Sequence, residues 1–383
     1  MRKHPAALTA AAAALLVFFA VTFAYPLSRM LAQITPEGAA VFSSTVFRRA
    51  VGSSCLSGAL TVLFALPLAM LMALLTESTR VRCRALWRGI FVLPMLLPSV
   101  SQGTGLVLLL GTNGLLTRGL RLPGSIYGLQ GIVLGQVLYT APIAYLLLAN
   151  LLRYRSRSPY DAARLAGVPP LFRWSGITLP FLRKELLAAA FLVFSLSVTD
   201  YGIPLAVGGK VKTLASVMYS SVVGQLDFGR GCVIGLLLLI PALCSSVFEL
   251  LAPRRWVVSA ARRPAEPPEN PRRDRWALLL CALTALLFVL PVLAVLTVGM
   301  LACAVIAPVA GVIEFAGGLF GFDVPFVMMQ FGSWAMPFWL TLPALLVLGA
   351  LFLGAAYGLW RALRGYVRVV SRGKSTLDAA KAG

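Results

Sequence analysis

The chain has 383 residues, of which 59% are hydrophobic and only 12% are charged, and its formal net charge is +21. A soluble domain could not keep so much apolar surface from water, and the apolar runs lack the two-residue alternation of barrel strands. The cations lie in short clusters between apolar runs, as in cytoplasmic loops, rather than in a nucleic-acid-binding patch. We therefore predict an all-α polytopic membrane protein embedded in a lipid bilayer, with no nucleic acid as partner.

About eight apolar runs approach the roughly 20 residues that a membrane-spanning helix needs. They lie approximately at 6–27, 50–75, 89–110, 129–152, 185–207, 232–252, 276–310 and 336–360. The first run could also be a signal peptide, but no clear small-x-small cleavage site follows it, so we favour an anchor. The run at 276–310 contains Pro291 and Pro308. It could be one tilted span, one span plus a re-entrant piece, or two short spans.

The basic clusters recur after alternate spans, which places both termini in the cytoplasm. This pattern divides the chain into four parts. They are a six-span transmembrane domain at 1–252, a basic proline-rich cytoplasmic linker at 253–275, a pair of spans at 276–360 and a basic cytoplasmic tail at 361–383. We expect the first six spans to form one core and the last pair to differ from it.

The cytoplasmic loop at 153–184 has the local signals of a helix-turn-helix. Ser158 is a suitable N-cap, and Asp161 three residues later completes a capping-box pattern for a helix that starts at Pro159. Gly167, followed by two prolines, predicts a left-handed stop after about two turns.

The predicted short helix presents small side chains to its surroundings. Ala162 and Ala166 share one face, while Ala163 and Gly167 share the adjacent face, so a groove of another protein could approach the helix closely. Leu165 and Phe172 are the apolar side chains that can anchor such a contact. The alternative is an amphipathic loop that packs on itself and only keeps the following span from sliding inward.

The stretch DAARLAGVPPLFRWSGITLP, at 161–180, resembles the cytoplasmic EAA loop of binding-protein-dependent ABC importer permeases. The matching positions are Asp161, Ala162, Ala163, Gly167, Ile177, Leu179 and Pro180. Two positions depart from the family pattern, because Asp161 replaces the leading Glu and Trp174 stands where Phe is usual. The resemblance implies a coupling helix at 159–167, including Leu165 and Ala166, that docks in a cleft of a separate cytoplasmic ATPase subunit.

The wider resemblance covers about 42–251, which implies that the first six spans form a permease-like core. The segments LPMLLPSV (93–100) and TDYGIPLAVGG (199–209) are similar to permeases of the branch that handles ferric iron, thiamine, polyamines or 2-aminoethylphosphonate. The resemblance implies a bacterial cytoplasmic (inner) membrane location and an extracytoplasmic substrate-binding protein as partner. It implies no cofactor, and the transported substrate is not readable.

Asp200 and Tyr201 are candidates for the substrate pathway, because they lie near the end of the fifth predicted span. An ionisable side chain near membrane depth is costly and usually faces protein or water. The alternative is that Asp200 is a helix-end residue at the outer interface, near the cations Lys210 and Lys212.

The family branch often fuses two homologous halves, and the chain resembles the first half of such a permease with a divergent C-terminal end. After residue 300 there is no second acidic-Ala-Ala-x3-Gly loop ending in Leu-Pro, because in LDAAKAG at 377–383 the glycine comes one residue early and the rest of the motif is absent. A second coupling helix would therefore come from a homodimer or from a second permease chain. The alternative is a non-transporting membrane scaffold or sensor, or an inactive remnant of a fused permease.

Enzymatic activity is not expected. The sequence contains no HExxH, GxSxG or GxxxxGK[ST] motif, so it predicts no catalytic residue, and ATP hydrolysis would belong to a partner subunit. The six cysteines form no CxxC pair or Cys/His cluster, which predicts no metal site.

Overall fold

The computed structural model describes residues 13–34, 38, 40–120, 125–153, 155, 158–251, 270–320, 330–331, 334–335 and 337–382. The predicted linker at 253–275 lies outside the described residues as far as 269, and so does the start of the first predicted span. Helices dominate the described part, since an apolar segment in lipid must satisfy its backbone hydrogen bonds internally. The strands described are the antiparallel pair β1 (Gln330–Phe331) and β2 (Trp334–Ala335).

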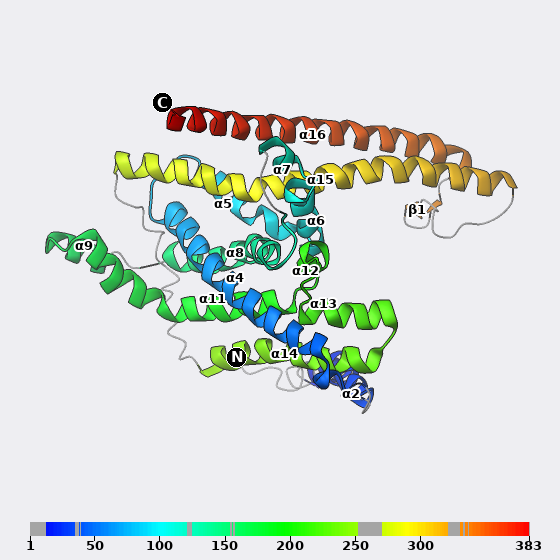
Figure 1. Cartoon of the computed structure of the whole chain (residues 1–383), viewed down its shortest axis with the longest axis horizontal. Coiled ribbons are helices and arrows are strands. Elements are labelled where there is room, and N and C mark those ends of the chain that lie inside the picture. The colour runs from blue at the N-terminus through cyan, green and yellow to red at the C-terminus, as the bar shows by residue number, and fades with distance from the viewer. Residues whose placement is uncertain are drawn as a thin grey trace, which may run out of the picture.

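Three long helices form the centre of the molecule: α4 (Thr45–Glu77), α8 (Leu129–Arg153) and α11 (Leu179–Thr199). Helix α14 (Phe228–Leu251) packs against α11, and α15 (Pro271–Phe320) packs on the opposite side of the bundle (Figure 1). The facing surfaces of α4 and α8 carry fully buried alanines, including Ala65, Ala69 and Ala141. Small side chains let helix backbones approach closely, which is how helices associate in lipid.

The described residues contain six helices that are long and apolar enough to span a membrane, or seven if one bent pair counts as a span. The first is Ala13–Ala32, which includes the π turn η1 (Ala20–Ala24) and α2 (Tyr25–Ala32). The 3₁₀ turn η2 (Ala40–Ser43) leads from it into α4. Adding α11, which is surrounded by α4, α8 and α14, gives the eight helical segments that the sequence predicts.

The predicted third span, at 89–110, is not one straight helix. The chain forms α5 (Arg84–Val92), the 3₁₀ turn η3 (Leu93–Leu96) and α6 (Ser99–Leu110), and it bends by 102° between residues 84–96 and 99–119. Leu97 is extended, with ψ 138°, because the residue before a proline avoids the helical conformation. Pro98 therefore breaks the span and starts a new helix; α7 (Leu115–Leu120) follows.

The predicted fifth span, at 185–207, is also interrupted. Helix α11 ends at Thr199 and Asp200 is extended with ψ 126°. Two short helices follow, α12 (Gly202–Val207) and α13 (Leu214–Tyr219), and then the π turn η5 (Ser220–Gly224). The break therefore leaves non-helical backbone inside the bundle, where Asp200, Gly202 and Ile203 are buried.

Helix α15 is continuous from Pro271 to Phe320, so the structure selects one helix among the three arrangements open for 276–310. Helix α16 (Phe338–Ala382) runs antiparallel along it (Figure 1). The first half of α15 packs into the main core, where Cys281 and Phe288 are buried and Phe288 contacts the ring of Phe91. The division of the chain at 252 and 276 stays a prediction, but the hairpin of α15 and α16 is attached to the core along α5 and α6.

Candidate functional site: the exposed loop helix and the broken helices

The predicted loop helix is α9 (Ser158–Leu165), at the far left in Figure 1, where it projects from the bundle. Its end has the predicted form, because Gly167 adopts φ +70°. The Val168 N–H donates to the Ala163 carbonyl at 2.9 Å, and the Gly167 N–H donates to the Arg164 carbonyl at 3.1 Å. These two bonds are the Schellman arrangement, so the stop predicted at Gly167 is confirmed.

The start of α9 differs from the prediction. The helix begins at Ser158 itself, one residue before the predicted start at Pro159, so Ser158 is not the N-cap. Among the described residues, the Asp161 carboxylate accepts no hydrogen bond from the Ser158 amide, and the capping-box prediction was wrong. The carboxylate is exposed.

Most side chains of α9 are exposed in the part of the chain that the structure describes. Asp161, Ala162 and Ala166 are exposed, Ala163 is half-buried, and the Leu165 side chain is 91% exposed. In the following turn, Phe172 is also exposed. Leu165 and Phe172 therefore present apolar surface that the described part of the chain leaves exposed.

The second part of the motif lies on a different element. Ile177 belongs to the π turn η4 (Trp174–Thr178), which follows α10 (Pro170–Arg173), while Leu179 and Pro180 open α11. The three segments form one continuous helix, which we call the lever (170–199). In the π turn the Leu179 N–H donates to the Trp174 carbonyl, five residues back instead of the four of an α-helix. This change in hydrogen-bond register comes directly before Pro180, which has no N–H to donate. The structure thus separates Asp161 to Gly167 on α9 from Ile177, Leu179 and Pro180 on the lever.

Asp200 directly follows Thr199, the last residue of the lever, and is only 9% exposed. Its carboxylate accepts hydrogen bonds from the N–H groups of Gly202 (3.3 Å) and Ile203 (3.1 Å), and it also contacts the Ser99 hydroxyl. Asp200 therefore caps α12 and joins it to the first residue of α6. A Cβ on Gly202 would lie 2.6 Å from the Val100 nitrogen, so only glycine permits this approach.

The Tyr201 side chain is 38% exposed, in contrast to Asp200. Its ring stacks on Tyr219 of α13, with centroids 4.8 Å apart and an interplanar angle of 8°. The structure therefore places the two predicted pathway residues differently, Asp200 inside the junction of the broken helices and Tyr201 at its surface.

A buried polar chain behind this junction is a feature that the sequence did not reveal. The Thr61 hydroxyl of α4 donates to the Gln136 side chain of α8 at 2.9 Å, and the Gln136 amide donates to the Ser197 carbonyl of α11 at 2.8 Å. The only sequence signal was the presence of polar side chains within apolar runs. Such bonds fix the three central helices in register.

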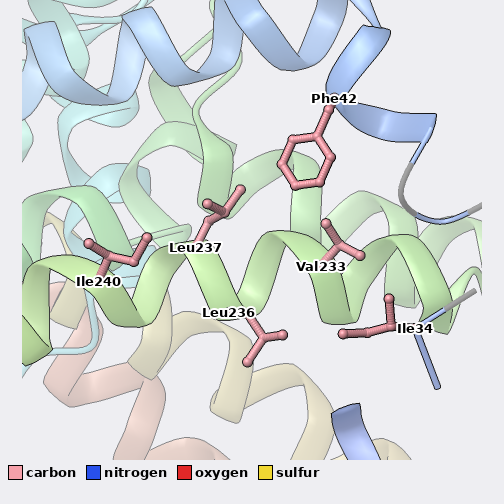
Figure 2. A pocket seen from close by; sticks show the side chains of 6 residues that line it. All are labelled: Ile34, Phe42, Val233, Leu236, Leu237 and Ile240. Carbon is pink, nitrogen blue, oxygen red and sulfur yellow. The ribbon is translucent and has the colours of Figure 1, made fainter. Parts of the chain in front are cut away.

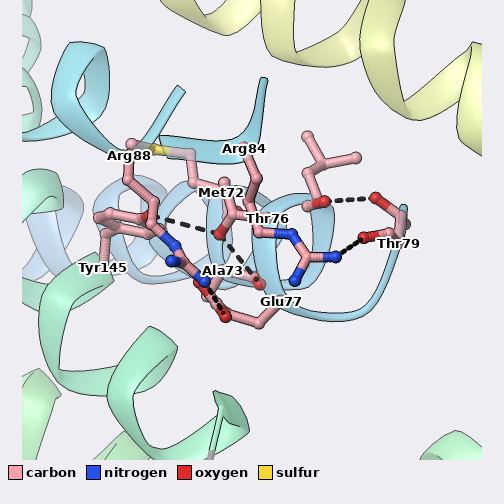
Figure 3. Close-up of polar contacts among 9 residues, drawn as sticks. Met72, Ala73, Thr76, Glu77, Thr79, Arg84, Arg88 and Tyr145 are labelled. Atoms are coloured by element: carbon pink, nitrogen blue, oxygen red, sulfur yellow. Dashed lines mark hydrogen bonds and ion pairs between the residues drawn. The ribbon is translucent and has the colours of Figure 1, made fainter. Parts of the chain in front are cut away.

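A second polar cluster lies where α4 turns into α5 (Figure 3). Arg88 donates two hydrogen bonds to the Glu77 carboxylate, at 2.8 and 2.6 Å, and Arg84 donates to the Thr79 carbonyl at 2.7 Å. The Thr76 hydroxyl lies 3.3 Å from the Tyr145 hydroxyl of α8. Cys83 at φ 58° makes the tight turn between the helices. The cluster holds the turn of α4 and α5 against α8.

Figure 2 shows a hollow of about 260 Å³ elsewhere on the molecule. Its lining residues are Ile34, Phe42, Val233, Leu236, Leu237 and Ile240. All are apolar, and no predicted site residue lines the hollow, so it supplies no groups for chemistry. Among the described residues, no three His, Cys, Asp or Glu side chains converge on a position that could hold a metal ion.

Residues 65–256 match the family model described as "Binding-protein-dependent transport system inner membrane component". The ferric transport system permease protein FbpB of Actinobacillus pleuropneumoniae is 29% identical over 189 residues, which is 47% of this chain and 28% of that protein. The thiamine transport system permease protein ThiP of Brucella abortus (strain 2308) is 32% identical over 207 residues, 51% of this chain and 37% of that protein. The chain thus matches about a third of the length of these relatives.

The fold is similar to that of a bacterial alginate ABC transporter solved in complex with an alginate pentasaccharide-bound periplasmic protein. The TM-score is 0.53 at 14% identity, and the match covers 67% of this chain and 96% of that chain. At this identity the likeness concerns the fold alone. The family match, by contrast, extends over half of this sequence and includes both the α9 loop and the broken fifth span. The chain therefore belongs to the family of binding-protein-dependent transport system inner membrane components and is a multi-pass protein of the inner membrane.

Proposed function

We propose that the protein is a membrane-spanning permease subunit of an ATP-driven solute importer, and that α9 is the coupling helix that docks on a separate cytoplasmic ATPase subunit. The observation that carries this proposal is the exposure of α9. It is a short helix with a fixed end and an apolar tip at Leu165, and it packs on little else in the described part of the chain. A self-packed loop would instead bury Leu165 against its own lever.

The lever connects this surface with the interior of the bundle. It runs without a break from Pro170 to Thr199, roughly 45 Å at 1.5 Å per residue, and packs between α4, α8 and α14. Its inner end is the Asp200 junction with α12 and α6. A displacement of α9 by the ATPase would therefore be delivered to the place where two spans are broken.

We further propose that the broken spans line the substrate pathway and face a second permease unit. In lipid, helix ends and extended backbone are tolerated only where they meet protein or a wet cavity. The breaks at Leu97 and Asp200 lie beside exposed side chains of Leu96, Val100, Tyr201 and Leu205. Tyr201 is the side chain that would meet the solute, and Asp200 holds the junction from behind. The second unit would be another copy of this chain or a different permease, and it would supply the second coupling helix.

The relatives' names include ferric iron, thiamine, spermidine or putrescine, and 2-aminoethylphosphonate. We propose a small solute of this range, delivered by an extracytoplasmic substrate-binding protein. The orientation follows from charge, because the turn of α4 and α5, α9 and the start of α15 carry arginines and lie at one end of the bundle (Figure 1). That end would be cytoplasmic, together with both termini.

Co-purification with an ATPase subunit from a neighbouring gene tests this proposal. The tagged wild-type permease should retain the ATPase, whereas Ala163→Arg should lower retention at least tenfold because it places a bulky side chain on the docking surface. Gly167→Trp should have an effect of the same size, because it adds bulk and also strains the left-handed turn that ends α9. Gly176→Trp is the matched control. Gly176 lies on the lever with open space beside it, and this variant should stay within twofold of wild type.

Equal retention by all four proteins would show that α9 does not dock the ATPase. A wild-type protein that retains no ATPase would favour the alternative function, a membrane scaffold or sensor that no longer transports.

A further inference from the structure

Helix α9 is joined to the lever at two places. The first is the chain itself, which passes through the turn at Gly167 into α10. The second lies at the opposite end of α9, where the Tyr160 hydroxyl is 3.0 Å from the Thr178 hydroxyl. Tyr160 lies near the start of α9 and Thr178 at the end of the π turn, so this hydrogen bond connects the first turn of the short helix with the lever.

Both partners are held in place by their surroundings. The Thr178 side chain is buried, and its backbone forms the last residue of η4. The Tyr160 ring is half-buried and is covered by the Arg155 guanidinium, whose carbon lies 4.7 Å from the ring centroid. A cation over an aromatic face is attractive, and it restricts the rotation of the ring. The hydroxyl of Tyr160 is thereby aimed at Thr178 from a fixed position.

We propose that Tyr160, through its hydrogen bond with Thr178, is a positioning residue that fixes the angle between α9 and the lever. This inference rests on the proposed function, in which α9 transmits the motion of an ATPase. A two-turn helix attached only at the Gly167 turn would pivot there, and a push on its surface would rotate α9 without moving the lever. Attachment at two points about two turns apart makes α9 and the lever one rigid body.

In this proposal Tyr160 positions α9 on the lever, and a different set of α9 residues forms the surface that docks on the ATPase. Tyr160 contributes its hydroxyl to an internal bond, whereas Asp161, Ala162 and Leu165 present exposed surface. Removal of the hydroxyl therefore leaves the docking surface in place. The ATPase should still bind, but its movement should no longer reach the lever in full.

Distance measurements between spin labels at Arg164 on α9 and Phe181 on the lever test the proposal. Both side chains are exposed, and labels carried by unnatural keto amino acids leave the six native cysteines in place. The wild-type permease should give a narrow distance distribution. Tyr160→Phe and Thr178→Val should each at least double its width, and the double variant should be no wider than either, because one bond is lost in all three.

Ser175→Ala is the matched control. The Ser175 hydroxyl bonds only within its own turn, to the Phe172 carbonyl, so this variant should keep the wild-type width. In the permease–ATPase complex trapped with ADP and vanadate, the wild-type distance should stay unchanged because α9 and the lever move together, whereas the Tyr160→Phe distance should shift.

A Tyr160→Phe distance distribution as narrow as that of wild type would overturn the proposed role of the Tyr160–Thr178 hydrogen bond. A wild-type distance that shifts on trapping would also overturn it. Loss of the ATPase from Tyr160→Phe would also overturn it, because the residue would then act in docking. Failure of the wild-type permease to retain the ATPase would instead overturn the proposed function. The distance measurement on the permease alone would still decide whether the Tyr160–Thr178 hydrogen bond fixes α9 to the lever.

Discussion

The Glu77 carboxylate is the most deeply buried charge among the described ion pairs, with only 3% of its side chain exposed. The negative charge of Glu77 is compensated by Arg88 of α5, which donates two hydrogen bonds to the carboxylate (Figure 3). A buried charge that loses its partner is strongly unfavourable, whereas replacement of both members by apolar side chains is often neutral. The pair therefore holds α5 to the end of α4 chiefly through the cost of separating it.

We predict that Arg88→Met lowers the free energy of unfolding by about 3–5 kcal/mol, because Glu77 is left buried without a counter-charge. Reversible unfolding of the purified protein in mixed micelles measures this difference. Arg82→Met is the control, since the Arg82 side chain is exposed in the same turn, and it should change stability by less than about 0.5 kcal/mol. Equal losses in the two variants would mean that the ion pair does not stabilise the turn.

The residues of the candidate site differ in how far sequence could predict them. Gly167 was predictable because a helix stop depends on the left-handed conformation of one residue and on bonds to its neighbours. The pairs Glu77–Arg88 and Tyr160–Thr178 were not, because each depends on how a turn brings two helices together. The capping box at Asp161 failed for a related reason, since the helix starts at Ser158 and the local pattern alone does not fix the first residue.

At the scale of elements, the apolar runs predicted where the third and fifth spans lie, but not the direction of the chain after the break in each. The 102° bend at Pro98 and the junction of α12 with α6 depend on Asp200, Ser99 and Gly202 meeting across about 100 residues of sequence. Pro291 and Pro308, by contrast, do not interrupt their helix. Helix α15 passes through both, because contacts with α16 and the core hold its two sides in line.

Helix α15 packs closely against α6 at Gly105, where a Cβ would lie 2.8 Å from the Pro291 carbonyl oxygen and 2.7 Å from a Val295 methyl group. We predict that Gly105→Val lowers the free energy of unfolding by about 1–3 kcal/mol, because the added side chain forces the two helices apart. Unfolding in mixed micelles gives the value. Gly52→Val is the matched control, because Gly52 is also helical and has open space around it. If both variants lose the same stability, the contact between α6 and α15 is not tight.

At the scale of the whole molecule, the exposed surface of α9 is separate from the polar junction inside the bundle, and one helix, the lever, connects them. The basic turns gather at the end of the bundle that carries α9, and the described broken spans lie near its centre (Figure 1). The sequence predicted this division, because charge clusters and apolar runs alternate along the chain. It did not predict that the first half of α15 would complete the core, since an apolar run carries no mark of the helix that it will contact.

The central claim is that the tip of α9 touches a cytoplasmic ATPase in the cell, and photocrosslinking from position 165 tests it most directly. A benzophenone amino acid at Leu165 should form an adduct with the ATPase subunit on irradiation of intact cells. The same amino acid at Lys212, an exposed residue of the segment assigned to the outside, should form none. An ATPase adduct from position 212, or its absence from position 165 while the ATPase is expressed, would contradict the account.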